Sequence, residues 1–265
     1  MSRTALRLAA CTMLWMACCG GQAAADDKKW HGPFGGAFSA SISAVTDYSF
    51  AGISQTNRQP AIQPSFHYRT GSFTNQFDLW AYVGLWGSNI EFPSSGKGIE
   101  IDYMTGLKAR AFEKRLSVEL GYVRYTYPGS PAELQYDYGD FIATLGWDFD
   151  IFQINGRIRY SPNSFGNSGM AWNKRVQASV PLPFLSFNEN FSFKVYGTLG
   201  NQWVDNFMNY GLPSNDYWYW QTGLVMTAYG LDFTVAYTDT SIDYAGCGFT
   251  PNCESRVIFG VTKVF

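Results

Sequence analysis

The chain has 265 residues, of which 46% are hydrophobic and 18% aromatic, and its formal net charge is -2. This weakly acidic balance argues against nucleic acid as a partner. After the first 25 residues no stretch approaches the roughly 18 consecutive apolar residues of a membrane helix, which excludes a helical membrane protein. A soluble secreted β-sandwich and an outer-membrane β-barrel both remain.

Residues 1–25 predict a secretory signal peptide. Arg3 and Arg7 form a basic start, an apolar run follows, and three alanines end at Ala25 as a small-residue cleavage site. A retained anchor is disfavoured because the run is too short to span a bilayer. A lipoprotein signal is disfavoured because Cys11 lies too close to Met1. Cleavage leaves 19 minus 2, or 17, basic residues against 21 acidic ones, followed by a short periplasmic lead-in at residues 26–36.

From Ala37 onward, apolar and polar residues alternate with a period of two, which predicts β-strands. In the first run Phe38 and Ile42 lie on one face and Ser39 and Ser41 on the other. Twelve such runs lie at residues 37–44, 60–69, 76–85, 99–108, 116–122, 140–149, 153–160, 175–182, 191–199, 218–226, 231–238 and 255–265.

The connections between these runs favour a barrel over a sandwich. Long connections are expected at residues 47–59, 87–97, 126–136, 161–171, 201–216 and 240–254, and short ones between them. Short periplasmic turns, long outer loops and aromatic residues at the ends of the apolar faces are typical of outer-membrane barrels. We therefore predict an all-β fold, an antiparallel up-and-down transmembrane barrel of about twelve strands over residues 37–265, with its apolar face against outer-membrane lipid.

The chain ends in the middle of its last strand, at Phe265. In a closed barrel this strand must pair with the first one so that no edge is left in lipid. We interpret Phe265 as the assembly signal that the barrel-assembly machinery reads. Lys263, on the apolar face, is tolerable only near the periplasmic interface, where its ammonium reaches the headgroups.

One stretch carries a family resemblance. It reads Asp47-Tyr48-Ser49-Phe50-Ala51-Gly52-Ile53-Ser54-Gln55-Thr56, then Gln59-Pro60-Ala61-Ile62-Gln63. This resembles the N-terminal signature of the proteobacterial TorF-type porins, and the similarity continues through Tyr237-Thr238-Asp239-Thr240 to a late cysteine pair. Members usually carry arginine where this chain has Ala51, so the role of that arginine is not carried over. The resemblance implies an outer-membrane barrel with a transport role and supplies no substrate.

The signature and the late cysteines each allow two interpretations. Asp47 and Gly52 are residues that stabilise a turn, or the loop folds inward and constricts the pore mouth, bringing Gln55 and Thr56 against solute. In an exported protein, Cys247 and Cys253 predict a small-loop disulfide. A metal site is the weaker interpretation, since no histidine lies nearby.

Charged residues on the polar faces suggest a lumen with two sides. Basic pore-lining candidates are Arg157, Arg159, Arg175 and Lys194, and acidic ones are Asp78, Glu100, Asp102, Glu119, Asp140 and Asp148. Facing sides of opposite charge would orient polar solutes and set ion preference. Alternatively these groups pair with one another and fill a lumen without an open pore, since twelve strands give an intermediate diameter.

These patterns predict a porin for passive diffusion of small hydrophilic solutes through a narrow charged lumen. We predict no enzymatic activity and no cofactor, because no phosphate loop or zinc spacing occurs. Catalysis would need a histidine beside a serine and an acidic or amide partner, whereas a single strand histidine such as His67, with Ser65 two residues away, is more often a hydrogen-bonded structural residue. The alternative is a non-conducting structural or adhesion barrel whose aromatic outer loops contact a ligand outside the cell.

Overall fold

The computed structural model describes residues 32–93, 95–186, 188 and 190–265. The predicted signal peptide and the first part of the lead-in lie outside the described residues. In the part of the chain that is described, no helix combines the length and apolarity needed to cross a membrane.

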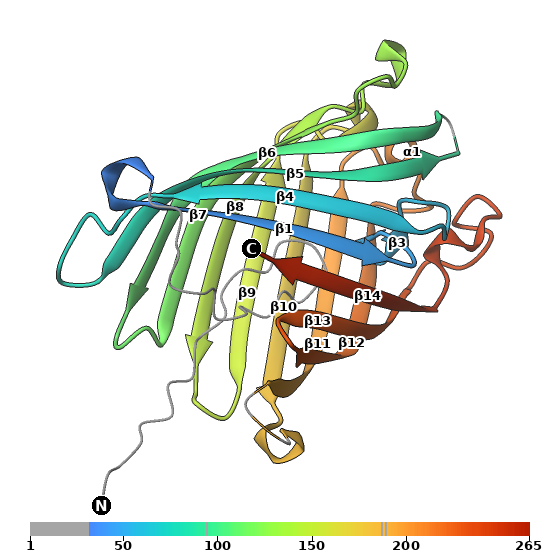
Figure 1. Ribbon diagram of the computed structural model, residues 1–265. Helices are drawn as coiled ribbons and strands as arrows, with labels where there is room; N and C mark the ends of the chain where they lie inside the picture. Colours follow the sequence, from blue (N-terminus) through green and yellow to red (C-terminus); the bar gives the residue numbers. More distant parts are fainter. Residues whose placement is uncertain (1–31, 94, 187, 189) are drawn as a thin grey trace, which may run out of the picture.

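Twelve strands pair into one closed antiparallel barrel (Figure 1), in which each strand lies beside the next and the last returns to the first. They are β1 (Ala37–Val45), β4 (Ala61–Arg69), β5 (Asp78–Phe92), β6 (Gly96–Ala111), β7 (Leu116–Thr126), β8 (Tyr138–Asp148), β9 (Gln153–Ser161), β10 (Ala171–Pro181), β11 (Phe191–Val204), β12 (Asp216–Ala228), β13 (Leu231–Thr240) and β14 (Arg256–Val264). The predicted all-β, up-and-down barrel is confirmed.

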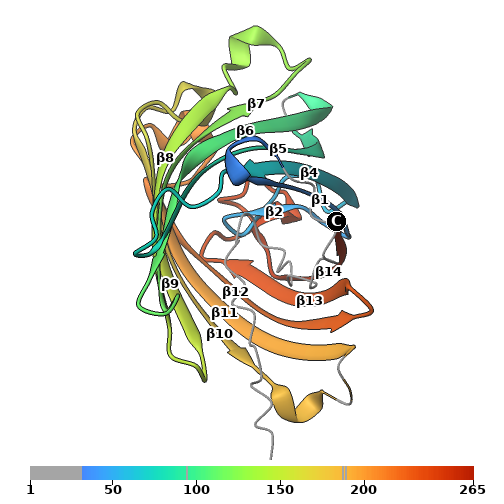
Figure 2. The ribbon, with the colours of Figure 1, turned by 60° about the vertical axis from the view of Figure 1, so that its left-hand side comes forward.

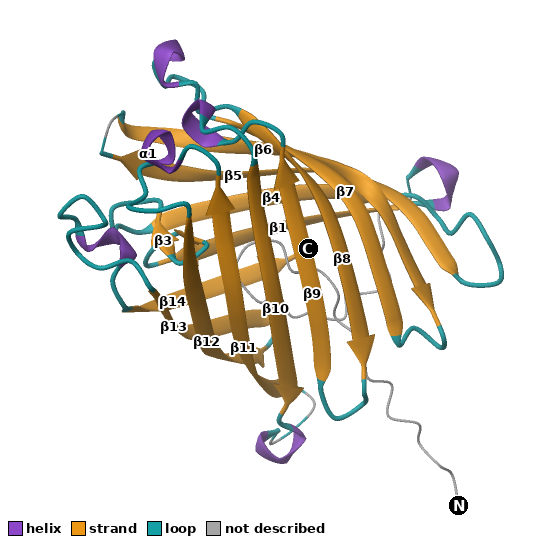
Figure 3. Ribbon diagram, turned by 180° about the vertical axis from the view of Figure 1, so that it is seen from behind, coloured by secondary structure: helices purple, strands orange, loops and turns teal. Residues whose placement is uncertain are grey.

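Long connections gather at one end of the barrel and short turns at the other, as Figure 3 shows. The long-connection end carries the short helical turns η2 (Ala132–Leu134), η3 (Phe165–Asn167), α1 (Phe207–Tyr210) and η5 (Pro251–Cys253), whereas η1 (Pro33–Gly35) and η4 (Pro183–Leu185) lie at the opposite end.

One predicted connection is wrong. Residues 87–97 form no long loop, because β5 and β6 continue as a hairpin on either side of residues 93–95. The extension is held by its inward side chains, since Ile90 and Phe92 are only 2% and 9% exposed. Burial of these apolar groups under the neighbouring loops stabilises strand where glycine and proline had indicated loop.

The two faces of the strands differ as the alternation predicts. Outward Ile62, Leu120 and Leu145 are 52%, 59% and 60% exposed, whereas inward Asp102 and Gln177 are 0% and 3% exposed. A continuous outward apolar band is suited to lipid rather than to water. Outward charges such as Arg124 and Lys174 lie near the long-connection ends of their strands, where the side chains can reach headgroups.

The barrel closes between β1 and β14. The paired register runs from Ser41 opposite Val264 to Val45 opposite Gly260. Phe265 extends it, because its amide donates to the Ala40 carbonyl at 2.8 Å and its carbonyl accepts from the Ala40 amide at 3.3 Å. The last residue of the chain therefore completes the seam.

The first long connection turns into the barrel. Two short strands, β2 (Ser49–Phe50) and β3 (Ile53–Ser54), form a small hairpin, and Figure 2 shows β2 inside the ring of barrel strands. We call residues 47–56 the inward hairpin.

An aromatic core covers the outer end of the lumen beside β5–β8. It contains Phe92, Tyr127, Tyr136 and Phe165, whose ring centroids lie 4.1 to 5.9 Å apart. Tyr127 and Tyr136 lie at the two ends of the connection between β7 and β8, whose middle, with η2, extends away from the barrel (Figure 1).

Candidate functional site

The carboxylate of Asp47 anchors the inward hairpin. Its Oδ1 accepts hydrogen bonds from Ser54 Oγ at 2.5 Å and from Thr56 Oγ1 at 2.8 Å, and its Oδ2 forms an ion pair with Arg256 Nε. The side chains of Asp47 and Arg256 are 5% and 7% exposed. Because the pair is buried, removal of either partner would leave an uncompensated charge inside the protein.

At the tip of the inward hairpin, only glycine fits against β12 and β13. Gly52 has a φ of +83°, and a Cβ atom there would lie 2.5 Å from Thr240 Cγ2 and 2.9 Å from Tyr219 Cβ. Its carbonyl accepts a hydrogen bond from Arg256 Nη1 at 2.9 Å. The turn chemistry and the close approach therefore fix how far the hairpin enters the lumen.

The predicted disulfide between Cys247 and Cys253 is confirmed. It lies in the last long connection, whose backbone carbonyls hold two arginines next to the inward hairpin. Arg58 donates to the carbonyls of Pro251 and Glu254, and Arg256 Nη1 donates to that of Asn252 at 3.3 Å. The cross-linked segment thus forms part of the hairpin's support.

Two cavities follow one another along the lumen. The outer cavity, about 210 Å³ with its solvent-open part, has a lining that includes Ser164 and Tyr210 from the long connections. The inner cavity, about 540 Å³ on the same basis, lies beside β9–β13 and the hairpin. Phe50 and Arg159 line both, and the Arg159 guanidinium carbon lies 4.3 Å from the Phe50 ring centroid. This pair therefore divides the outer cavity from the inner one.

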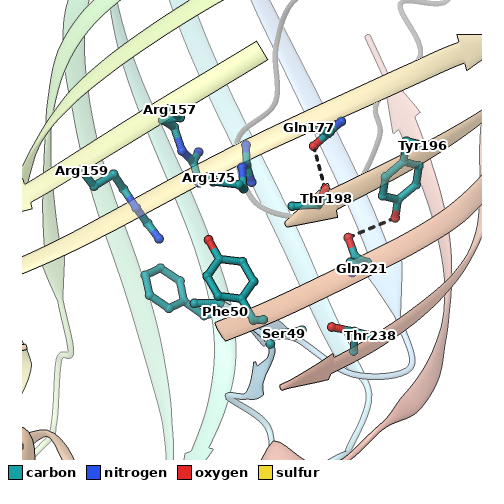
Figure 4. A pocket seen from close by; sticks show the side chains of 13 residues that line it. Ser49, Phe50, Arg157, Arg159, Arg175, Gln177, Tyr196, Thr198, Gln221 and Thr238 are labelled. Atoms are coloured by element: carbon teal, nitrogen blue, oxygen red, sulfur yellow. Dashed lines mark hydrogen bonds between the residues drawn. The ribbon is translucent and has the colours of Figure 1, made fainter. Parts of the chain in front are cut away.

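The inner cavity is lined mainly by polar side chains (Figure 4). Its lining comprises Ser49, Phe50, Ala51, Gly52, Arg157, Arg159, Arg175, Gln177, Tyr196, Thr198, Tyr219, Gln221 and Thr238. Three of the four basic candidates lie together here. The fourth, Lys194, lies outside this lining, nearer the short-turn end of β11.

The strand register explains this grouping. Arg157 and Arg175 face each other directly across β9 and β10. One level further toward the short-turn end, Gln177, Thr198, Gln221 and Thr238 are successive cross-strand partners from β10 to β13. A charged row and an amide-hydroxyl row therefore lie side by side on the same inner surface.

The acidic candidates are distributed along the opposite side of the barrel. Glu100 and Asp102 are 2% and 0% exposed, and the Tyr48 hydroxyl donates to both Glu100 oxygens at 3.2 and 3.3 Å. Burial and then the charge of Glu100 raise the pKa of Tyr48 well above its ordinary value, so the hydroxyl stays protonated and able to donate. This bond fastens the hairpin to the acidic side as well.

The other acidic candidates have partners of their own. Asp140 lies 3.8 Å from Arg159, and Glu119 lies 3.3 Å from Lys108. At the short-turn end, Asp148 accepts hydrogen bonds from the backbone of Asp150 and from Gln153, and Asp78 is the register partner of Arg110. The two sides of the lumen are thus in contact at Asp140 and Arg159 and, at the short-turn end, at Asp148 and Gln153 of β9.

The two loop candidates are placed differently from the cavity-lining residues. Thr56 is 1% exposed with its hydroxyl on Asp47, and Gln55 Nε2 donates to the Ile53 carbonyl at 3.1 Å. The part of the hairpin that lines the inner cavity is residues 49–52. Phe50 is part of the signature in the sequence, but its position in the lumen was not predicted.

The side chains of Ser65 and His67 have separate neighbours. Ser65 Oγ bonds Ser41 Oγ at 2.7 Å, while His67 lies against Gly84 of the next strand. Within the described ranges, no group of three or more His, Cys, Asp or Glu side chains is placed to hold a metal ion.

Comparison with solved structures identifies the fold. An outer membrane channel from Pseudomonas putida F1 superposes with a TM-score of 0.50 at 8% identity, covering 87% of this chain and 96% of that one. The NanC porin gives 0.46 at 12% identity, with coverages of 86% and 98%, and LpxR from Salmonella typhimurium gives 0.48 at 9%, with coverages of 86% and 99%. At 8% identity, the superposition on the Pseudomonas putida F1 channel shows a shared barrel fold and nothing finer.

Comparison at the sequence level is more specific. A search of curated proteins found no match. The profile of a family described as "Bacterial protein of unknown function (Gcw_chp)" matches residues 30–265, which is almost the whole chain after the predicted signal peptide. The chain therefore belongs to the Gcw_chp family.

Proposed function

We propose that the protein is an outer-membrane channel through which small hydrophilic solutes diffuse passively. The observation that carries this proposal is the pair of polar cavities in series, which run from the long connections to the middle of the strands and are divided at Phe50 and Arg159. An aqueous lumen needs polar side chains inside and an apolar band outside, and both are present. The inward hairpin is then the constriction.

Several further properties belong to the same proposal. The resemblance to TorF-type porins supports a transport role, and the signal peptide at residues 1–25 would direct export. The apolar outer face would contact outer-membrane lipid, and Phe265 would be recognised by the barrel-assembly machinery.

Planar-bilayer recording of the refolded protein tests the channel. We expect discrete conductance steps in KCl, smaller than those of wide porins because the hairpin occupies the lumen. Liposome swelling with neutral sugars of graded size then measures the size limit. Absence of steps above the background of empty detergent would contradict a channel.

A non-conducting barrel with ligand-contacting outer loops is the second candidate. The observation in its favour is the aromatic core of Phe92, Tyr127, Tyr136 and Phe165, which covers part of the outer mouth. If this candidate is right, liposomes will not swell in any sugar, whereas a channel admits the smallest of them.

A further inference from the structure

The regular pairing between β4 and β5 ends halfway along β4. Against β1, the register covers the whole of β4. Against β5, it stops at Ser65, which lies opposite Trp86. We call the remainder, residues 61–64 of β4 and the facing residues 87–90 of β5, the outer β4–β5 junction, because it adjoins the long connections. The wall of the barrel therefore has a different construction at this junction from the rest of β4.

A proline explains why the ladder stops. The amide of Ile62 points toward β5, since it donates to Asn89 Oδ1 at 2.9 Å. Amides two residues apart point to the same side of a strand, so Pro64 occupies the next position that faces β5, where it has no N–H to donate. Within sheets, proline is otherwise confined to edge strands, first residues and bulges. This closed barrel thus contains a strand segment with the character of an edge.

A side chain and the inward hairpin take the place of the ladder. Asn89 is exposed, and its side-chain amide bridges the two strands: Oδ1 accepts from the Ile62 amide, and Nδ2 donates to the Pro60 carbonyl at 2.9 Å. The backbone amide of Glu91 donates to the Gln55 carbonyl of the inward hairpin at 2.8 Å. The strands are therefore held together here through one side chain and through the hairpin.

Apolar surface lies on both sides of the outer β4–β5 junction. On the outside, Ile62 and Leu85 are 52% and 45% exposed and continue the apolar band of the barrel. On the inside, Ala61 and Ile90 are 1% and 2% exposed and belong to the same apolar cluster as Tyr48. The inner cavity with its polar lining lies beside β9–β13 instead. An apolar chain that crosses the wall at this junction would therefore meet apolar side chains on either side.

We propose that the outer β4–β5 junction is a lateral opening in the barrel wall, through which the alkyl chain of an amphiphile dissolved in the outer leaflet reaches the apolar side of the lumen. Asn89 and the inward hairpin hold the opening closed. Gln63 and Ser88, whose side chains meet at 3.4 Å on the inside, mark its deep end, because the regular pairing begins next to them. This lateral route is separate from the axial passage of hydrophilic solutes.

Cysteine labelling from the lipid phase tests the opening. Ser88→Cys places a thiol on the inner side of the junction, and Ser43→Cys places one on β1, which is paired with both of its neighbours at that level. The two serines are 5% and 7% exposed, and Cys247 and Cys253 are joined and do not react. In phosphatidylcholine vesicles, N-dodecylmaleimide should label Ser88→Cys at least about fivefold faster than Ser43→Cys, the factor that corresponds to one ordinary hydrogen bond.

Two further changes in the Ser88→Cys protein should move its labelling rate in opposite directions. Asn89→Leu removes both bridging hydrogen bonds and keeps the outer surface apolar, so labelling should become faster. Pro64→Ala supplies an amide that faces β5 and can extend the ladder, so labelling should become slower. The heat-modifiable band shows whether each variant is folded. If Asn89→Leu does not fold, Pro64→Ala and the comparison with Ser43→Cys still decide the question.

Three results would overturn the lateral opening. Equal labelling of Ser88→Cys and Ser43→Cys by N-dodecylmaleimide would mean that the junction is as closed as the fully paired wall. Faster labelling of Ser88→Cys by a sulfonated maleimide in water than by N-dodecylmaleimide would mean access along the lumen. A rate that neither Asn89→Leu nor Pro64→Ala changes would mean that these residues do not control the junction. Labelling requires no ion flow, so the result is independent of whether the barrel conducts.

Discussion

At the scale of single residues, Asp47 connects more of the inward hairpin than any other side chain described above. It receives two hydroxyl hydrogen bonds from the hairpin itself and an ion pair from Arg256, which lies 209 positions away along the chain. These three donors keep the Asp47 carboxylate in its buried position, because water could replace their hydrogen bonds only in part.

The change Asp47→Asn keeps the size of this side chain and removes its charge. Arg256 would then be buried without its anion, so we expect the free energy of unfolding to fall by about 3–5 kcal/mol. The hairpin should leave the lumen and conductance should rise. Chemical unfolding in detergent measures the first effect and bilayer recording the second.

Glu254→Gln serves as the matched control for this change. Its pair with Arg58 spans 3.9 Å with side chains 46% and 29% exposed, so its loss should change stability by less than about 1 kcal/mol. An Asp47→Asn protein that unfolds and conducts like the wild type would contradict the anchoring role.

Phe50→Ala tests the division between the two cavities. Removal of the ring that lies over Arg159 joins the outer and inner cavities, so conductance should rise and the size limit in liposome swelling should move to larger sugars. Phe112→Ala removes the same ring from an exposed short turn, where the side chain is 65% exposed, and should change neither quantity. Unchanged sugar permeation in Phe50→Ala would place the constriction elsewhere.

At the scale of elements, the disulfide segment and the inward hairpin act as a pair. Carbonyls of residues 251–254 hold Arg58 and Arg256, and Thr240 Oγ1 donates to the Cys253 carbonyl at 2.8 Å. Although the hairpin follows the first strand, its stability therefore depends on a connection near the end of the chain.

Replacement of Cys247 and Cys253 by serine should loosen both elements. The chain-entropy estimate for so short a loop is about 2 kcal/mol of lost stability, and amide exchange at residues 48–56 should become faster. Hydrogen-exchange mass spectrometry measures this exchange rate peptide by peptide. Phe249→Ala, a change inside the same loop that keeps the disulfide, should leave the exchange of residues 48–56 at the wild-type rate.

The strands were predictable from the sequence, and the hairpin's contacts were not. A period-two pattern arises locally, because one face meets lipid and the other the lumen, so twelve runs could be located from it. In the β5–β6 hairpin, Gly87 and Gly96 indicated a loop. The segment forms strands because Ile90 and Phe92 are buried beneath other connections. The inward direction of residues 47–56 was one of two interpretations, because its anchor Arg256 is remote in sequence.

At the scale of the whole molecule, closure depends on very few residues. β1 pairs with β4 from Ala37 to Val45 but with β14 only from Ser41 to Val45, and Phe265 adds the pair with Ala40. The pairing of β1 with β14 is therefore shorter than its pairing with β4. At the short-turn end of the barrel, the β1–β14 pairing ends at Phe265.

Deletion of Phe265 should lower the amount of heat-modifiable barrel in the outer-membrane fraction while export to the periplasm continues. The deletion removes both backbone hydrogen bonds to Ala40 and the terminal aromatic ring, which is 67% exposed on the lipid side. Phe265→Trp keeps both features and should assemble normally. Wild-type barrel levels in the deletion mutant would contradict this role.

The composition of the lumen was predictable residue by residue, but its grouping was not. Alternation assigned Arg157, Arg159 and Arg175 to the inner face, and all three line the inner cavity. The stagger between strands places Lys194 outside this cavity and brings Gln177 and Gln221 into one row. Register is set by the closed sheet as a whole, so no single strand carries that information.

The ion pair of Asp47 and Arg256 has a consequence for the order of events in assembly. Asp47 follows the first strand of the barrel, and Arg256 begins the last, so the binding place of the hairpin exists only after the two ends of the sheet have met. The hairpin therefore links the first strand to the last and also narrows the lumen. Any event that expels it from the lumen also removes this side-chain link between the two ends of the sheet, so the passage widens and the seam is weakened at the same time.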